Sequence, residues 1–444
     1  MNGDNNGNNC YTIKANNLTL DGTLRAHSGC IIVIIAGNFL SEINGSGVGT
    51  VDVSGVTDSD TAAEFELTAS GSVTLNGTKI DATGATGGHQ GGDIVITGTT
   101  VTGSTAIHAD ATTGNGGNYG GTVSVATTAT TNGDFNIDLT GNISVNAAGT
   151  TSANNGGTIT MDAKGGLTVG TSSHDLEAKG TGAGFGGDIS LTAEGGTATI
   201  NGALNVNCGG ATGFIPEGGS IEVAGNSIST GTAWTAAATD ANGWGGSITA
   251  TAKPAGSAGT ITTTSASSFS VEGGTGGLGG SIDVEASGSI TLAGDMNAQA
   301  AGLADGGDIK IAAGVTSSST LTIQSTATFH ADVTGTTGFE DGTIELSGCN
   351  VTIAGDADTR NTSTSNPGQN TVTYQGAFTT NSGSSLLADN VSGGKGGNLV
   401  HCRCVDNNHD GVCDTPVSCV SSPSFSGTVT PSATISPTAQ AACS

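Results

Sequence analysis

Positive charge and aromatic side chains are both scarce in this sequence of 444 residues. It contains 10 lysines and arginines against 37 aspartates and glutamates, so its formal net charge is −27, and only 3% of its residues are aromatic. A chain this acidic is repelled by phosphate backbones and by anionic lipid headgroups. The composition therefore argues against nucleic acid and anionic membrane surfaces as partners.

Long apolar runs are missing as well. The most apolar stretch, residues 31–35 (IIVII), is far shorter than the roughly 20 residues of a membrane-spanning helix and predicts a buried strand. No membrane span is expected. The N-terminal residues MNGDNNGNN show no basic region followed by an apolar core, so no signal peptide is visible. This leaves a cytosolic protein or an exported one that has lost its leader, and the nine cysteines favour an extracellular or cell-surface location.

The abundant residue is glycine, with 77 copies, and many of them occur as pairs inside one repeated phrase. In residues 91–96 (GGDIVI), two glycines precede a small polar residue and then an apolar-x-apolar pattern. The phrase returns at intervals of 27 to 36 residues as GGTVSV from Gly120, GGTITM from Gly156, GGDISL from Gly186, GGSIEV from Gly218, GGSITA from Gly245, GGSIDV from Gly279, GGDIKI from Gly306 and DGTIEL from Asp341. A period of this length is typical of a solenoid.

Each period contains three short segments with strand-like alternation. The first follows the glycines, the second places a threonine between apolar residues, as in Leu167-Thr168-Val169, and the third places a small residue two positions after an apolar one, as in Phe329 and Ala331. Alternation of period two puts the apolar side chains on one face. The sequence therefore predicts an all-β fold, a parallel β-helix (β-solenoid) with three short strands per rung of about 30 residues.

Composition divides the chain into four parts. Residues 1–10 predict a polar N-terminal lead-in, residues 11–400 the β-helix, residues 401–419 a cysteine-rich segment, and residues 420–444 an uncharged tail rich in Ser, Thr and Pro. A tail of this composition is expected to be a linker or a stalk.

The repeat pattern, with its double glycine, its LTV or ITL segment and its IxAxG segment, resembles the repeats of large secreted β-helical adhesins related to filamentous haemagglutinins and autotransporter passengers. The likeness covers roughly residues 11–400. It implies a right-handed parallel β-helix at a microbial surface or in a matrix. The secretion domain of that family is not evident in this sequence.

One motif in the cysteine-rich segment predicts metal binding. Gly411 supplies a sharp turn, and oxygen ligands alternate around it: Asp406, Asn408, Asp410, the carbonyl of Val412, and Asp414. Hard oxygen donors at this spacing suit Ca²⁺. Val417 stands where an EF-hand has glutamate, and no helix pattern flanks the loop; the motif instead resembles the calcium loops of thrombospondin type 3 repeats. The alternative interpretation is an ordinary acidic turn.

The cysteines around this loop predict disulfides. Four of them bracket it: Cys402, Cys404, Cys413 and Cys419. In an exported protein, disulfides hold together small segments that lack a core. A zinc site that combines these thiols with His401 or His409 is the alternative, although the C-x-C spacing departs from the usual C-x-x-C.

The remaining cysteines differ in their expected roles. Cys10 and Cys30 fall in adjacent predicted rungs and are candidates for a disulfide. Cys208 follows the inward positions Leu204 and Val206, which predicts a small core residue. Because nine is an odd number, one cysteine must be free or bonded to another chain.

A polysaccharide lyase or hydrolase is the main alternative function, because such enzymes also use parallel β-helices. They need clustered carboxylates, or Ca²⁺ together with a basic residue. This sequence has no adjacent aspartate pair, its lysines are scattered, and its histidines, such as His108 and His330, stand alone. Asp93, Asp188 and Asp308 share their repeat position with threonines and serines, which predicts a polar turn ladder.

We therefore expect a protein that is not an enzyme. The hypothesis is an extracellular structural or adhesive β-solenoid of a microbial cell surface or matrix that associates with itself into filaments; a monomeric stalk or adhesin is the alternative. Surface glycans and other cell-surface proteins are further candidate partners.

Overall fold

The computed structural model describes residues 10–26, 29–43, 48–55, 63–86, 90–112, 117–128, 135–149, 153–209, 215–253, 258–302, 305–314, 316–334, 342–360, 368–388, 396–404, 413 and 418–440. Every regular element in these ranges is a β-strand. Within the same ranges, no helix is long and apolar enough to cross a membrane.

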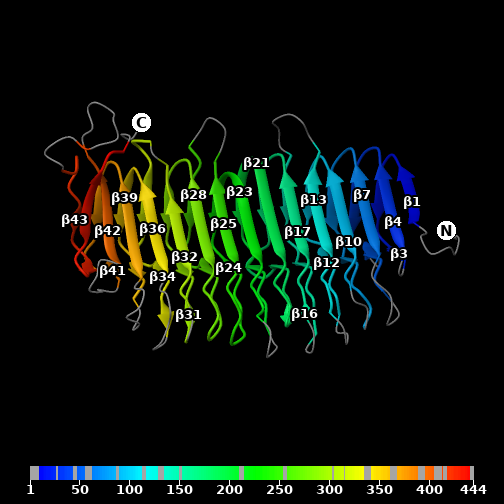
Figure 1. Ribbon diagram of the computed structural model, residues 1–444. Helices are drawn as coiled ribbons and strands as arrows, with labels where there is room; N and C mark the ends of the chain where they lie inside the picture. Colours follow the sequence, from blue (N-terminus) through cyan, green and yellow to red (C-terminus); the bar gives the residue numbers. More distant parts are fainter. Residues whose placement is uncertain are drawn as a thin grey trace. The chain divides into compact units, whose positions relative to one another are not determined.

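The chain forms two compact units. Unit 1 comprises residues 1–225 and 234–240, and unit 2 comprises residues 226–233 and 241–444. In each unit, three short strands make up a rung, and each strand pairs in parallel with its counterpart about 30 residues later (Figure 1). The predicted parallel β-solenoid is thus confirmed.

The strands of unit 1 fall into three sets by their place in the rung. First strands are β1 (Cys10–Ala15), β4 (Cys30–Ile35), β7 (Glu64–Ala69), β10 (Asp93–Gly98), β13 (Thr122–Thr127), β17 (Thr158–Ala163) and β21 (Asp188–Ile200). Second strands are β2 (Leu18–Leu20), β5 (Phe39–Glu42), β8 (Val73–Asn76), β11 (Val101–Gly103), β14 (Ile137–Leu139), β18 (Leu167–Val169) and the second half of β21. Third strands are β3 (Thr23–Arg25), β6 (Thr50–Asp52), β9 (Lys79–Asp81), β12 (Ala106–His108), β15 (Ile143–Ser144), β19 (Leu176–Glu177) and β22 (Leu204–Asn205). Strands β23 (Ser220–Thr230) and β24 (Ala233–Thr235) contain residues of both units.

Unit 2 repeats the same arrangement. First strands are β25 (Ser247–Ala252), β28 (Ser281–Ala286), β32 (Asp308–Ala312), β36 (Thr343–Gly348), β39 (Gln369–Tyr374), β42 (Gly397–Arg403) and β45 (Thr434–Thr438). Second strands are β26 (Ile261–Thr263), β29 (Ile290–Leu292), β33 (Thr320–Ile323), β37 (Asn350–Ile353), β40 (Phe378–Thr380) and β43 (Ser424–Phe425). Third strands are β27 (Ser268–Ser270), β30 (Asp295–Asn297), β34 (Thr328–His330), β38 (Asp356–Asp358), β41 (Ser385–Leu387) and β44 (Thr428–Thr430). Each unit also has one short strand pair outside these sets. In unit 1, β16 (Ala153–Asn154) pairs with β20 (Thr181–Gly182), and in unit 2, β31 (Ala300–Ala301) pairs with β35 (Val333–Thr334).

The core consists of columns of apolar side chains, one residue from each rung. In unit 1, Ile94, Val123, Ile159 and Ile189 are register partners on successive first strands, and each is at most 1% exposed. Burying aliphatic side chains in such columns is the main favourable term for the stack. The fold therefore needs only a few large residues per rung, which accounts for the low apolar content of the sequence.

The double glycine is required because the backbone passes close to two neighbours at this corner. A Cβ atom on Gly120 would lie 1.8 Å from the carbonyl oxygen of Val145, at the end of a third strand. A Cβ atom on Gly121 would lie 1.9 Å from the carbonyl oxygen of Gly92, in the preceding rung. Only glycine fits at either position.

The residues that directly follow the glycine pairs form the polar turn ladder that the sequence predicted. The Ser220 hydroxyl donates to Asp188 Oδ1 at 2.5 Å in unit 1, and the Thr343 hydroxyl donates to Asp308 Oδ1 at 2.6 Å in unit 2. These aspartates therefore serve the stack.

The prediction of a linker or stalk for residues 420–444 was wrong over residues 424–438. Strands β43, β44 and β45 pair in parallel with β40, β41 and β42 and continue the solenoid of unit 2. Val429 is in register with the buried Leu386, and Ile435 with the buried Val400. Serine, threonine and proline content concealed this alternation, which has the same period as that of the other strands.

Candidate functional site

Three disulfides have both cysteines among the described residues, and they lie at two places in the fold. In unit 1, Cys10 on β1 is bonded to Cys30 on β4, with their Cα atoms 4.4 Å apart. In unit 2, two disulfides tie β42 and the residue after it to the segment that follows: Cys402 with Cys419 (Cα atoms 5.5 Å apart) and Cys404 with Cys413 (5.7 Å). All six predicted candidates are thus paired, and the four sulfurs of the cysteine-rich segment are not available as zinc ligands.

Cys208 is a free cysteine in the interior of unit 1, as its position in the repeat predicted. Its side chain is buried, and this burial raises the pKa of its thiol to about 12. Only a thiolate is nucleophilic, so this group is chemically inert at neutral pH. Cys349, in unit 2, is disulfide-bonded.

In the sequence, the predicted calcium ligands fall between Cys404 and Cys419. Asp406, Asn408, Asp410, Val412 and Asp414 fall outside the described residues, so calcium binding at this loop stays a prediction. Within the described ranges, no group of three or more His, Cys, Asp and Glu side chains is arranged to hold a metal ion.

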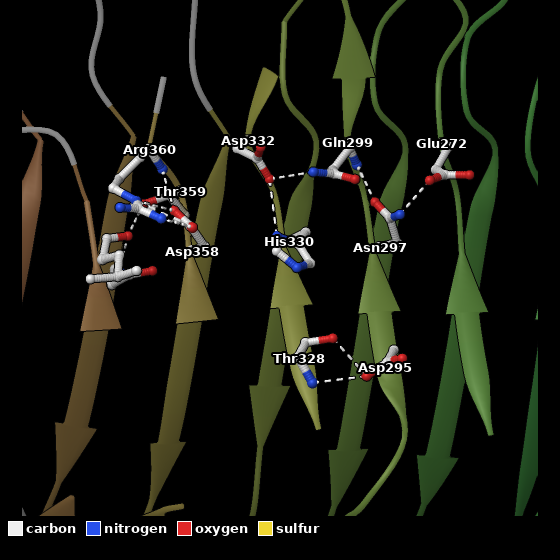
Figure 2. Close-up of polar contacts among 12 residues, drawn as sticks. Glu272, Asp295, Asn297, Gln299, Thr328, His330, Asp332, Asp358, Thr359 and Arg360 are labelled. Carbon is white, nitrogen blue, oxygen red and sulfur yellow. Dashed lines mark hydrogen bonds and ion pairs between the residues drawn. The ribbon is translucent and has the colours of Figure 1, made fainter. Parts of the chain in front are cut away.

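A second candidate site is the outward face of the third strands in unit 2. Alternation buries Phe269, Met296 and Phe329, each at most 1% exposed, and turns the residues between them to the surface. These outward residues form three columns, named here the polar ladder: Ser268, Asp295, Thr328, Asp356 and Ser385; Ser270, Asn297, His330, Asp358 and Leu387; Glu272, Gln299, Asp332 and Arg360. Figure 2 shows how side chains of successive rungs reach one another across this face.

His330 lies at the centre of the ladder among three carboxylates. Its Nδ1 atom is 3.3 Å from Asp332 Oδ1 on the same rung. Asp295 belongs to the preceding rung. On the following rung, Asp358 is the register partner of His330. The interaction with Asp332 raises the pKa of His330 above its ordinary value, the other two carboxylates add to this, and partial burial opposes it. The protonated, positively charged form of this histidine is therefore favoured.

The carboxylates around His330 are already hydrogen-bonded. Arg360 donates to Asp358 from its backbone N–H and from its guanidinium, whose Nε lies 2.9 Å from Oδ1 and whose Nη2 lies 2.6 Å from Oδ2. Gln299 Nε2 donates to Asp332 Oδ1 at 2.6 Å, and Thr328 donates its backbone N–H and its hydroxyl to Asp295 Oδ1 at 3.0 and 2.7 Å (Figure 2). The ladder consequently ties neighbouring rungs together.

Unit 1 contains the same apolar-His-Ala-Asp pattern, but its histidine has a serine as partner. The tetrapeptide Ile107-His108-Ala109-Asp110 has the same spacing as Phe329 to Asp332, with histidine and aspartate facing outward. Here His108 Nδ1 is 2.8 Å from Ser144 Oγ, and this hydroxyl donates to Asp110 Oδ2 at 2.7 Å. The serine therefore accepts from the imidazole. Burial raises the pKa of the Asp110 carboxyl, and its hydrogen bonds offset part of that effect.

The prediction that the histidines stand alone was therefore wrong for His108 and His330. The scattered lysines are also paired: Lys253 Nζ lies 2.6 Å from Glu285 Oε2, and Lys179 Nζ lies 2.8 Å from Glu177 Oε1. The recurrence of the apolar-His-Ala-Asp pattern was the signal in the sequence that could have revealed the two histidine clusters.

Comparison of the chain with protein-family models, with curated proteins and with solved structures finds no match.

Proposed function

We propose that the protein is an extracellular structural or adhesive β-solenoid of a microbial surface or matrix, and that it self-associates into filaments. The observation that carries this proposal is the placing of the disulfides. They bond β1 to the next rung and fasten the cysteine-rich segment to β42. Disulfides persist in oxidising compartments, which supports export.

The cross-links also suit a protein that must resist unfolding outside the cell. In a solenoid each rung contacts only its neighbours, so a rung with one neighbour opens first. Strand β1 pairs only with β4 among the described residues. A covalent bond at this point opposes its detachment.

Unpaired strand edges support self-association. Among the described residues, β1 has no partner on the side away from β4, and β45 has none on the side away from β42. Phe425 and Ile435, beside the second edge, are 38% and 45% exposed. Free edges with exposed apolar side chains are templates for pairing between chains, and a heterologous contact of this kind produces filaments.

We include calcium in the proposal, held by the loop from Asp406 to Asp414. One disulfide joins Cys404 to Cys413, so an ion bound by the residues between them would stiffen the segment beside β42.

Electron microscopy and sedimentation of the purified protein test this function. We expect filaments in Ca²⁺ that shorten or dissolve when a chelator or a reductant is added. Separate particles of constant size under all three conditions would reject self-association, and reduced cysteines in freshly isolated protein would reject the extracellular location.

A β-helix enzyme that degrades polysaccharides is the second candidate, and the cluster of His330 with Asp332 and Asp358 favours it. General acid and base catalysis needs carboxylates and a group that titrates near neutral pH. Release of reducing ends from polysaccharides by the wild-type protein, and its loss in Asp332→Asn, would establish this alternative. We expect no release, because Arg360 and Gln299 already engage these carboxylates.

A further inference from the structure

Exposed aromatic side chains share one position of the repeat. Tyr119, Phe185 and Trp244 are 48%, 47% and 39% exposed, and each directly precedes a Gly-Gly pair. The described residues contain one other exposed aromatic side chain, Phe425. In a chain with so few aromatic residues, this coincidence indicates a role at the surface, because exposed rings contribute little to the core.

In unit 1 the residues at this position form a line, named here the aromatic column: Gln90, Tyr119, Asn155, Phe185 and Glu217. Backbone hydrogen bonds hold successive members in register. The N–H of the glycine after each residue donates to the carbonyl of the next member, at 2.9 Å to Tyr119, 2.9 Å to Asn155, 3.0 Å to Phe185 and 2.9 Å to Glu217. The backbones of neighbouring members are therefore about 4.8 Å apart, and those of Tyr119 and Phe185 about 10 Å apart.

Buried asparagines fix the corner from which the column projects. Asn118 and Asn154, which precede Tyr119 and Asn155, are fully buried. Asn118 Nδ2 donates to Asn154 Oδ1 and to the carbonyl of Ala148, both at 2.9 Å. With the glycine corner packed directly after each column residue, the backbone from which the column projects is held in place, so binding requires no rearrangement of that backbone.

Polar groups lie between the rings. Asn155 Oδ1 accepts the backbone N–H of Phe185 at 2.9 Å, which orients the amide and leaves Nδ2 as a donor, since no bond of Nδ2 occurs within the described ranges. Gln90 and Glu217 are exposed at the two ends of the column. Flat apolar rings alternating with amides and a carboxylate suit a ligand that has apolar C–H faces and hydroxyl groups.

We propose that the aromatic column binds a neutral, linear polysaccharide that lies along the stack of rungs. Sugar rings pack on Tyr119 and Phe185, and their hydroxyls meet Gln90, Asn155 and Glu217. The net charge of −27 disfavours an anionic polymer. A protein partner is a poorer fit, because the core of a protein interface is a continuous apolar patch, whereas polar residues separate these rings. The inference names the ligand of the proposed adhesive function and rests on it.

The test is retention of the intact protein on cellulose, chitin and mannan, with polygalacturonate as the anionic polymer. We expect retention on at least one neutral polymer and none on polygalacturonate. The double substitution Tyr119→Ala with Phe185→Ala should weaken binding roughly tenfold or more, because aromatic side chains that pack against a ligand contribute most of the binding affinity. Its thermal unfolding should match that of the wild type, since both rings are exposed.

Four further variants make the result specific. Tyr119→Trp and Phe185→Trp keep a ring and should retain binding. Asn155→Asp keeps the acceptor for Phe185 but loses the amide donor, and should bind more weakly. Ile43→Ala removes an apolar side chain that is 61% exposed outside the column, and should bind as the wild type does.

Retention on no neutral polymer, or equal retention of the double alanine variant, would overturn the inference. So would a double variant that loses self-association instead of polymer binding, because the column would then be a contact between copies. Filaments with intact disulfides that bind no polymer would reject polysaccharide binding alone. Polymer binding by a monomeric protein whose cysteines are reduced would instead reject the proposed function.

Discussion

At the scale of single residues, the environment of His330 makes part of the stability depend on pH. Its pKa is raised in the folded state, chiefly by Asp332. The stabilisation is therefore complete below the ordinary pKa of histidine, near 6.5, and is lost as the pH rises through the raised pKa. Because the side chain is 37% exposed, we expect no more than about 1 kcal/mol.

This effect can be measured by urea unfolding of unit 2 between pH 5 and pH 8. His330→Gln should lower the unfolding midpoint most at the acidic end, and the difference from wild type should shrink as the pH rises. Asp332→Asn should move the NMR titration of His330 towards lower pH. Equal losses at all pH values would show that His330 acts by packing alone.

The buried thiol of Cys208 should be inert in the folded protein. Its pKa of about 12 leaves almost no thiolate at pH 8. Iodoacetamide should modify this residue only after denaturation, which peptide mass spectrometry detects. Fast labelling in native protein would contradict the buried position.

At the scale of elements, the glycine corner should be intolerant of a side chain. Gly186→Ala would place a Cβ atom 1.8 Å from the carbonyl oxygen of Val206, and we expect a loss of about 3 kcal/mol or more, or a failure to fold. Gly22→Ala is the matched control, because no atom lies within 4 Å of its Cβ position. Urea unfolding of both variants checks the difference; similar midpoints would refute the packing at the corner.

The bond between Cys10 and Cys30 should hold β1 on the stack of unit 1. Replacing both residues by serine removes a cross-link across 20 residues of sequence, worth about 2–4 kcal/mol in typical proteins. Hydrogen exchange should become faster at residues 10–15 and stay unchanged at residues 93–98. Uniform acceleration in both strands would mean that β1 does not open locally.

How much of each element could be predicted depended on the signal in its own residues. Strands after a double glycine, such as β10 and β28, repeat a local pattern and were predictable. Strands β43 to β45 lack the glycines and alternate Phe425, Val429 and Ile435 with small polar residues, so their composition resembled a linker.

The candidate site was harder to predict for a geometric reason. Asp295, His330 and Asp358 meet on one face although 35 and 28 residues separate them in sequence. Because the repeat interval varies, which outward residues become neighbours depends on the length of every turn between them. The aromatic column could have been found from sequence, since its residues all precede the glycine pair.

At the scale of the whole molecule, we propose that a disulfide-stabilised solenoid assembles outside the cell. The stack of rungs has parallel strands spaced by about 4.8 Å along its axis. A filament built by adding rungs of one copy to rungs of the next would continue this spacing, whereas lateral association would not.

The most direct test of this central claim is electron microscopy with diffraction of the purified protein, in Ca²⁺ and then in chelator. We predict filaments in Ca²⁺ with a repeat of about 4.8 Å along the filament axis, and shorter or no filaments in chelator. Separate particles in both solutions would contradict the account.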